Sequence, residues 1–246
     1  MSTQPRAVVV TGGGKGIGRA VVARFAAAGD RVVAVGRDRE ALEEAGAAKA
    51  EVCDVTDEDQ VAALFERLGA IDVLVNNAGV ATSAPLERTT LDEWRAHLDV
   101  NATGTFLCTR AAAGGMIARG NGRIVTVAST AGLAGARYTA AYTASKHAVV
   151  GLMRAVAAEV AGTGVTANAV CPTYVRTEMT HRSIARIVAA TDRSEEEAEA
   201  ALVAASPLGR LLEPEEVAFA VAFLADPAAG AINGQTLVLD GGGIQS

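Results

Sequence analysis

The sequence predicts an α/β fold: a doubly wound, parallel, seven-stranded sheet with helices on both faces. Short Val-rich runs alternate with longer segments of helical period, which is typical of βαβ proteins. The short runs are almost continuously apolar, as expected of strands that are covered on both faces. The 246 residues are 50% hydrophobic but only 4% aromatic, and 26 are Gly, so small and β-branched side chains must fill the core.

The expected strands, in chain order, are residues 7–10, 31–35, 50–53, 71–75, 123–128, 166–170 and 236–239. The expected helices between them are residues 18–28, 57–68, 91–118 and 140–161. In the first helix, Val21, Val22 and Phe25 recur at helical spacing, and Gly29 ends it. Because no repeat or low-complexity linker divides the chain, we expect one domain over residues 1–246.

Residues 177–207 break this rhythm. The segment is charged, contains a Ser-Glu-Glu-Glu run at 194–197, and has no strand pattern. It is either a mobile lid or a pair of solvated surface helices. Its position directly after a strand end favours a substrate lid.

Charge and cysteine content exclude several classes of function. The formal net charge is 22 − 28 = −6, which argues against non-specific nucleic-acid binding. Cys53, Cys108 and Cys171 are odd in number and form no CxxC pair, as expected of thiols in a reducing compartment. No stretch approaches 18 apolar residues, so we expect a cytoplasmic protein without a membrane partner.

A glycine-rich loop, TGGGKGIG at residues 11–18, follows the first strand and leads into a helix. Its glycines let the backbone approach a pyrophosphate, and the helix N-terminus offers free N–H groups to it. An ordinary tight turn is the alternative, but the order strand, loop, helix favours a nucleotide site of Rossmann type. Gly12, Gly16 and Gly18 form a TGxxxGxG pattern that resembles the short-chain dehydrogenase/reductase family.

Further motifs occur in that family's order along the whole chain. They are NNAG at residues 76–79, Asn101 within DVNATG, Ser129 after the fifth strand, and Tyr142 and Lys146 within YTASK. Each alone could be a turn, a cap or a surface residue. Together they resemble the family, in particular its 3-oxoacyl reductases and its 3-hydroxyacyl and hydroxybutyrate dehydrogenases.

The residue types of the Tyr-Lys pair suggest acid–base chemistry. Four residues apart on a helix, Tyr142 and Lys146 share one face. A free phenol titrates near about pH 10, and a neighbouring cation lowers its pKa toward neutrality. A hydroxyl such as that of Ser129 can donate a hydrogen bond to a substrate carbonyl.

The resemblance implies a nicotinamide-dependent oxidoreductase that interconverts a carbonyl and a secondary alcohol. It implies that Tyr142 is the acid and base, that Ser129 polarises the carbonyl, that Lys146 lowers the Tyr142 pKa, and that Asn101 holds a proton-relaying water. The cofactor residues that it implies, besides Tyr142 and Lys146, are Gly12, Lys15, Gly16, Ile17, Gly18, Arg37, Asp54, Val55, Asn77, Ala78, Gly79, Pro172, Val175 and Thr177. A catalytically idle dinucleotide sensor or scaffold is the alternative from another class.

The cofactor is expected to be NADP(H). NAD-preferring family members carry an acidic residue where this chain has Gly36, whereas Arg37 and Lys15 could contact a 2′-phosphate that no carboxylate repels. A one-residue shift would place Asp38 there instead, so an NAD-dependent alcohol or 3-hydroxyacyl dehydrogenase is the alternative.

The substrate is expected to be a small ketone or an acyl thioester, contacted by Ser129, Tyr138 and Tyr174. Thr173 replaces the family's usual Gly in the segment CPTYVRTEM. Arg119 and Arg123 are possible docking charges for an acidic carrier protein. The three histidines, His97, His147 and His181, lack ligand spacing, and no metal is expected. The resemblance also implies a homotetramer, and the apolar face of the helix at 140–161 is either an interface or sheet cover.

Overall fold

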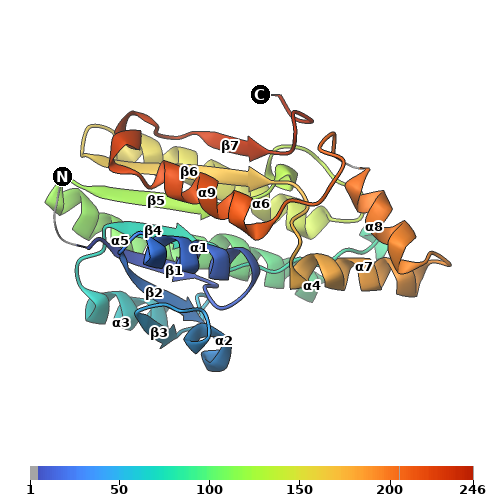
Figure 1. Cartoon of the computed structure of the whole chain (residues 1–246), viewed down its shortest axis with the longest axis horizontal. Helices are drawn as coiled ribbons and strands as arrows, with labels where there is room; N and C mark the ends of the chain where they lie inside the picture. The colour runs from blue at the N-terminus through green and yellow to red at the C-terminus, as the bar shows by residue number, and fades with distance from the viewer. Residues whose placement is uncertain (1–4, 205, 246) are drawn as a thin grey trace.

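Seven parallel strands form one sheet in the computed structural model, which describes residues 5–204 and 206–245 (Figure 1). Their order across the sheet is β3-β2-β1-β4-β5-β6-β7. The strands are β1 (Ala7–Thr11), β2 (Arg31–Gly36), β3 (Lys49–Val52), β4 (Val73–Asn76), β5 (Gly122–Val127), β6 (Val165–Pro172) and β7 (Thr236–Leu239). All seven predicted strands are confirmed, and their ends shift by no more than two residues.

The sheet places a crevice where strand order reverses. β1 pairs with β2 on one side and with β4 on the other. In a doubly wound sheet, the loops that leave such a pair of strands run to opposite faces, and ligands bind in the crevice between them. The glycine loop after β1 and the NNAG turn after β4 both lie at this crevice.

Side chains alternate along β1 between two apolar layers. Val8 and Val10 belong to one layer and Val9 to the other. The helices over the first layer are α1 (Gly16–Ala27), α2 (Arg39–Glu43) and α9 (Pro214–Leu224), and Figure 1 shows α1 and α9 side by side. Those over the second are α3 (Glu58–Leu68), α5 (Gly104–Arg119) and α6 (Ala140–Glu159). The predicted cover on both faces is therefore confirmed.

The helix predicted over residues 91–118 is interrupted. It consists of α4 (Leu91–His97), a π-helical segment (Leu98–Thr103) and α5. The π-helical segment contains the buried Asn101, and such bulges are frequent at functional sites. A single π-helical turn changes the apolar spacing too little to be recognised in the sequence, so the pattern predicts one continuous helix.

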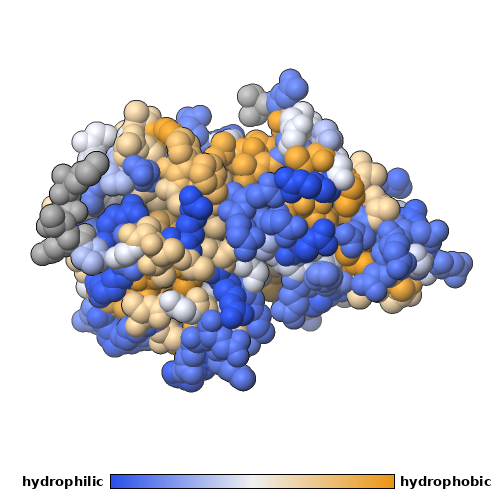
Figure 2. Space-filling model, viewed as in Figure 1, coloured by the Kyte–Doolittle hydropathy of each residue, from blue (hydrophilic) through white to orange (hydrophobic). Residues whose placement is uncertain are grey.

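Residues 178–203 form two helices, α7 (Glu178–Ala190) and α8 (Glu195–Val203), that project beyond the sheet (Figure 1). They share a small apolar cluster of Ile184, Ala198 and Leu202. Ser194 and Glu197 cap each other's backbone at the start of α8, so the charged run begins a helix. In Figure 2 the exposed surface of this end is mostly hydrophilic. None of the helices among the described residues has the length and apolar character needed to span a bilayer.

Candidate active site

The glycine loop packs tightly between β1 and α1. A Cβ on Gly18 would lie 2.0 Å from the Gly12 carbonyl oxygen, so only glycine fits there. Thr11 Oγ1 accepts hydrogen bonds from the N–H groups of Asn77 and Ala78, which fixes the NNAG turn against the loop. No side chain caps the N-terminus of α1 at Lys15. The N–H groups of its first turn are thus available to an anion, as a pyrophosphate requires.

A cavity of about 380 Å³ lies beside this loop. The predicted cofactor residues that line it are Gly12, Lys15, Arg37, Asp54, Val55, Ala78 and Gly79. Others support it: the side-chain amide of Asn77 donates to the carbonyls of Thr11 and Gly12, and Thr177 lies against Gly16. An open cavity walled by glycine backbone, beside an uncapped helix N-terminus, fits the adenosine and pyrophosphate portion of a dinucleotide.

The cations at the outer end of the cavity are paired. Lys15 Nζ lies 2.8 Å from a carboxylate oxygen of Asp38, and Arg37 Nη1 lies 3.8 Å from one of Asp54. The hydrogen bond between these two side chains raises the pKa of Lys15 and lowers the pKa of Asp38. The expectation that no carboxylate lies beside Lys15 and Arg37 is therefore wrong. Gly36, not Asp38, ends β2, and Asp38 caps α2 by accepting from the Ala41 N–H.

Ser129 and Tyr142 meet beyond the carboxyl end of β5. Ser129 begins a short 3₁₀ turn, where its Oγ accepts from the Ala131 N–H, and Tyr142 lies in the first turn of α6. Burial raises the pKa of the Tyr142 phenol, and a hydrogen bond with Ser129 acts in the opposite direction. The two hydroxyls that the sequence assigned to one site are thus brought together.

Lys146 is 6% exposed, and its Nζ donates a 3.0 Å hydrogen bond to the Val127 carbonyl oxygen. The same nitrogen lies 5.8 Å from the centroid of the Tyr142 ring. Burial lowers the Lys146 pKa to about 8. The resemblance implies that Lys146 lowers the pKa of Tyr142. In the structure the pKa of the Tyr142 phenol is raised, mainly by burial, and the Lys146 ammonium forms its hydrogen bond with the backbone.

Asn101 completes the cluster. Its Oδ1 accepts from the Val80 N–H at 2.8 Å, and its Nδ2 donates to the Val80 carbonyl and to Ser145 Oγ. Ser145 Oγ in turn donates to the Tyr142 carbonyl oxygen. A Cβ on Gly79 would lie 3.2 Å from Asn101 Oδ1 and 3.8 Å from Lys146 Nζ. Asn101 and Lys146 therefore lie at the wall formed by Gly79 and Val80, with the Tyr142 ring beside Lys146 and Ser129 beside Tyr142.

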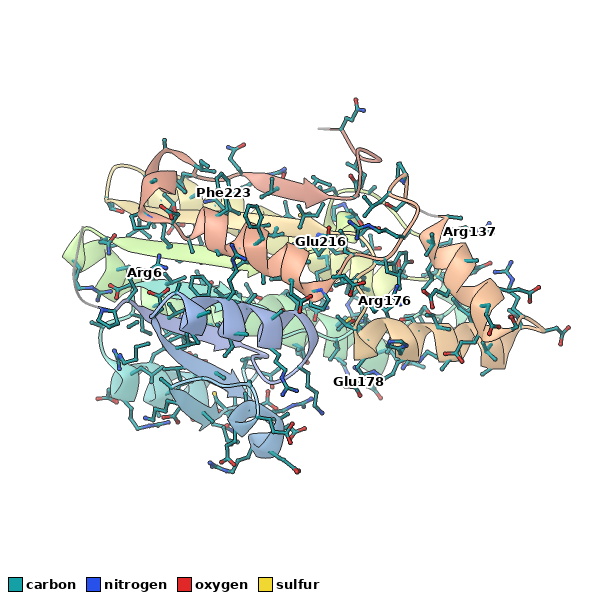
Figure 3. All side chains as sticks on the ribbon, in the orientation of Figure 1. Arg6, Arg137, Arg176, Glu178, Glu216 and Phe223 are labelled. Carbon is teal, nitrogen blue, oxygen red and sulfur yellow. The ribbon has the colours of Figure 1, made fainter. Side chains whose placement is uncertain are left out.

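The segment after β6 starts the projecting helices. Pro172 ends β6, Val175 bridges to Leu212, and Thr177 caps α7 by accepting from the Thr180 N–H. Arg176 and Glu178, labelled in Figure 3, lie at this junction, and Arg176 forms ion pairs with Glu199 of α8 and Glu213 before α9. The start of the α7–α8 pair is thereby tied to the domain.

The two other tyrosines differ in exposure. Tyr174 packs against the apolar cluster of α7 and α8, and burial raises the pKa of its phenol. The neighbouring Tyr174 also contributes to the raised pKa of Tyr142. Tyr138 is 56% exposed and has a φ of 66°, unusual for a residue other than glycine. The Arg137 guanidinium lies 5.4 Å from the Tyr138 ring centroid, and Arg137 is labelled in Figure 3.

Arg123 is not a docking charge. It is 8% exposed, and its guanidinium donates to the carbonyls of Gly122, Gly164 and Pro227 at the amino ends of the strands, away from the cavity.

The apolar face of α6 covers the sheet at Val149 and Ala157, which are buried in the core. Ala148, by contrast, is exposed. Within the described part of the chain, no group of three His, Cys, Asp or Glu side chains could hold a metal ion.

Sequence reasoning missed several residues of the site. Val80, Val100 and Leu42 line the cavity, while Thr11 and Ser145 position the NNAG turn and Asn101. Thr11 and Ser145 lie within the TGGGKGIG and YTASK motifs themselves, where a small hydroxyl at the end of a strand or one residue before the Lys is the available signal for their roles. The apolar lining residues carry no signal that separates them from ordinary core.

Comparisons with known proteins agree with this geometry. A family model described as Enoyl-(Acyl carrier protein) reductase matches residues 12–243. A 3-oxoacyl-(acyl carrier protein) reductase of Synechocystis sp. is 38% identical over 95% of both chains. A D-threitol dehydrogenase of Mycolicibacterium smegmatis is 39% identical over 96% of this chain and 92% of its own.

A solved structure of an actinorhodin polyketide ketoreductase variant with NADPH has a TM-score of 0.91. It is 39% identical and covers 98% of each chain. The glycine loop, the NNAG turn and the cluster of Asn101, Ser129, Tyr142 and Lys146 thus occur in a chain whose relatives match it from end to end. The chain belongs to the short-chain dehydrogenase/reductase family of oxidoreductases.

Proposed function

We propose that the protein is an NADP(H)-dependent ketoreductase that interconverts a ketone, such as a 3-oxoacyl compound, and the corresponding secondary alcohol. The convergence of Ser129, Tyr142 and Lys146 beside a cavity that fits the adenosine and pyrophosphate portion of a dinucleotide carries this proposal. Relatives named for reduction of 3-oxoacyl and polyketide ketones support the substrate class.

The chain's own residues supply the proton and the binding of the substrate oxygen. Ser129 donates a hydrogen bond to the carbonyl oxygen, which stabilises the negative charge that develops there. Tyr142 gives its proton to that oxygen in reduction and removes it in oxidation. Lys146 and a water beside Asn101 return a proton to Tyr142. When bound, NADPH supplies the hydride.

The glycine loop and the first turn of α1 hold the cofactor's pyrophosphate in this proposal, through the N–H groups of residues such as Ile17 and Gly18. Lys15 and Arg37 contact the 2′-phosphate, and Asp54 and Val55 flank the adenine. Pro172, Val175 and Thr177 border the nicotinamide. Tyr138 and Tyr174 contact the substrate, and residues 177–207 form a lid over it. The chain forms a single domain over residues 1–246, of which residues 1–4, 205 and 246 lie outside the described part.

Replacing Tyr142 with Phe tests the assignment. NADPH oxidation with a panel of ketones and acyl thioesters should fall by at least about a hundredfold, because the variant has no proton to give. The NADPH dissociation constant should stay nearly unchanged. Tyr138→Phe is the comparison variant: it removes an exposed phenol that is proposed to contact the substrate, so it should change the substrate KM and leave kcat within about twofold of wild type. Retained turnover in Tyr142→Phe would refute the role, and an inactive wild-type protein would favour a nucleotide sensor.

An NAD-dependent alcohol or 3-hydroxyacyl dehydrogenase is the second candidate, because carboxylates of Asp38 and Asp54 lie beside both cations. Dissociation constants for NADPH and NADH decide between the two. Tighter NADPH binding is expected, and Asp38→Asn should tighten it severalfold further by freeing Lys15, an effect that salt weakens. Asp57→Asn, which makes the same change of charge at the N-cap of α3, is the control. Equal affinities or tighter NADH binding would favour the second candidate.

We further propose a cytoplasmic homotetramer. Three buried, unpaired cysteines suit a reducing compartment. Ala148 and Gly151 are small and exposed on α6, so a second helix could approach closely there. Light scattering at working concentration should give four times the chain mass, and a monomeric mass would contradict the assembly.

A further inference from the structure

His97 is buried at the end of α4, and the proposed chemistry does not use it. It is 2% exposed. Its Nδ1 lies 2.7 Å from the Glu93 carbonyl oxygen, which can only accept a hydrogen bond. Its Nε2 lies 3.0 Å from the Thr82 N–H, which can only donate one. Both contacts require the same neutral tautomer, with the proton on Nδ1.

The imidazole also touches the catalytic tyrosine. The centroids of the His97 and Tyr142 rings lie 6.3 Å apart, and their planes meet at 76°, an edge-to-face contact. One ring therefore connects the backbone at Thr82 with the side chain of the proposed proton donor.

A second connection runs parallel to the first. Asn101, four residues after His97, binds both backbone groups of Val80, two residues before Thr82. Through Ser145 it also reaches the Tyr142 carbonyl. Val80 lines the cofactor cavity. Two side chains, Asn101 and His97, thus hold segment 80–82, and each is also connected to Tyr142. Asn101 reaches the Tyr142 backbone through Ser145, whereas His97 contacts the phenol ring directly.

We infer that His97 is a positioning residue: by accepting from the Thr82 N–H while packing on Tyr142, it fixes the phenol relative to the cofactor wall. It touches no reacting atom, so it acts through Tyr142. The inference rests on the proposed function for its catalytic consequence, but the clamp on segment 80–82 can be measured independently of turnover.

Three substitutions separate the contacts of His97. Gln places an amide oxygen near the position of Nε2 and can still accept from Thr82. Asn places an amide near Nδ1 and keeps at most the bond to Glu93. Phe keeps an aromatic ring and loses both bonds. His147, exposed on α6 with the same type of bond from Nδ1 to a carbonyl four residues earlier, provides the control His147→Phe.

The first measurement is amide hydrogen exchange of the peptide that contains residues 80–84. Protection should fall by roughly tenfold or more in His97→Phe and His97→Asn and should stay near the wild-type value in His97→Gln and His147→Phe. Unchanged protection in His97→Phe would overturn the clamp, whether or not the protein reduces ketones.

The second measurement is steady-state kinetics with NADPH. In His97→Phe and His97→Asn, kcat should fall by roughly tenfold, since misplacing a catalytic group slows the chemical step, with the NADPH dissociation constant within about twofold of wild type. His97→Gln should restore kcat. Wild-type kcat in His97→Phe, or a loss that Gln does not rescue, would overturn the positioning role. An inactive wild-type protein would refute the proposed function and leave the exchange result to decide the clamp.

Discussion

Lys146, which the proposed function places in the proton relay, carries a cost in stability. Its ammonium is almost completely buried, and burial lowers its pKa to about 8 from the usual 10.5. An unfolded chain keeps that proton up to about pH 10.5. Between these values the unfolded state binds more protons than the folded state, so this lysine makes the free energy of unfolding rise with pH.

Lys146→Met should therefore show a pH-dependent gain in stability. At about pH 7 the variant avoids the charge-burial penalty, of order 3 kcal/mol at 1.36 kcal/mol per pKa unit, although it loses the hydrogen bond to Val127. By about pH 9.5 much of that advantage should disappear, because the wild-type lysine is then largely neutral when folded. Urea unfolding of both proteins at the two pH values measures the difference. A difference that is independent of pH would contradict the lowered Lys146 pKa.

The residues of the site divide by the kind of signal that reveals them. Tyr142 and Lys146 were predictable because their chemistry needs two residue types at one fixed spacing. The contacts of His97 with Thr82 and Tyr142 were not, because they join segments far apart in the chain, and a lone histidine has no spacing to interpret. The pairing of Lys15 with Asp38 was missed for the same reason.

At the scale of elements, apolar patterning predicted all seven strands because a parallel sheet buried on both faces needs continuous apolar runs. It also predicted α1, α3 and α6. It missed the short α2, which has too few turns for a period, the helix α9, and the π-helical segment at 98–103, which contains Asn101. The charged pattern of residues 177–207 favours a lid over a pair of surface helices, and it does not predict α7 and α8 individually because the apolar cluster that joins them has only three buried residues.

The close contact between β1, the glycine loop and α1 makes Gly18 irreplaceable. In Gly18→Ala the Cβ would collide with the Gly12 carbonyl oxygen and lie 2.6 Å from the Asn77 side chain. The loop must shift, at a cost of about 3 kcal/mol in unfolding free energy, and NADPH affinity should fall with it. Thermal unfolding and NADPH titration measure both effects.

Gly114→Ala is the matched control. Gly114 is exposed on α5, and a Cβ there would meet no atom within 4 Å, so the higher helix propensity of Ala should leave stability equal or up to about 1 kcal/mol greater. If Gly18→Ala were as stable as this control, the loop would be far less constrained than its geometry indicates.

Over the whole molecule, the residues at the carboxyl ends of the strands and those at the amino ends have different roles. The candidate cofactor cavity and the proposed catalytic cluster of Asn101, Ser129, Tyr142 and Lys146 lie at the carboxyl ends of the strands. At the amino ends, Arg6 forms an ion pair with Asp30, and the guanidinium of Arg123 joins the start of β5, the loop before β6 and the connection after α9. The carbonyls that Arg123 binds are brought together only when strands distant in sequence are in register. We therefore expect Arg123 to stabilise the fold without contributing to turnover.

Arg123→Met tests this separation of stability from chemistry. The variant leaves several backbone carbonyls without their charged donor, so the unfolding free energy should fall by about 3 kcal/mol. The kcat of the folded fraction should remain at the wild-type value, because no residue of the catalytic cluster contacts this end of the sheet. Arg110→Met, which breaks an exposed ion pair with Glu58, should cost less than about 1 kcal/mol. Urea unfolding with kinetics on the same samples gives both quantities, and a fall in kcat without a fall in stability would show that the two ends of the sheet are coupled.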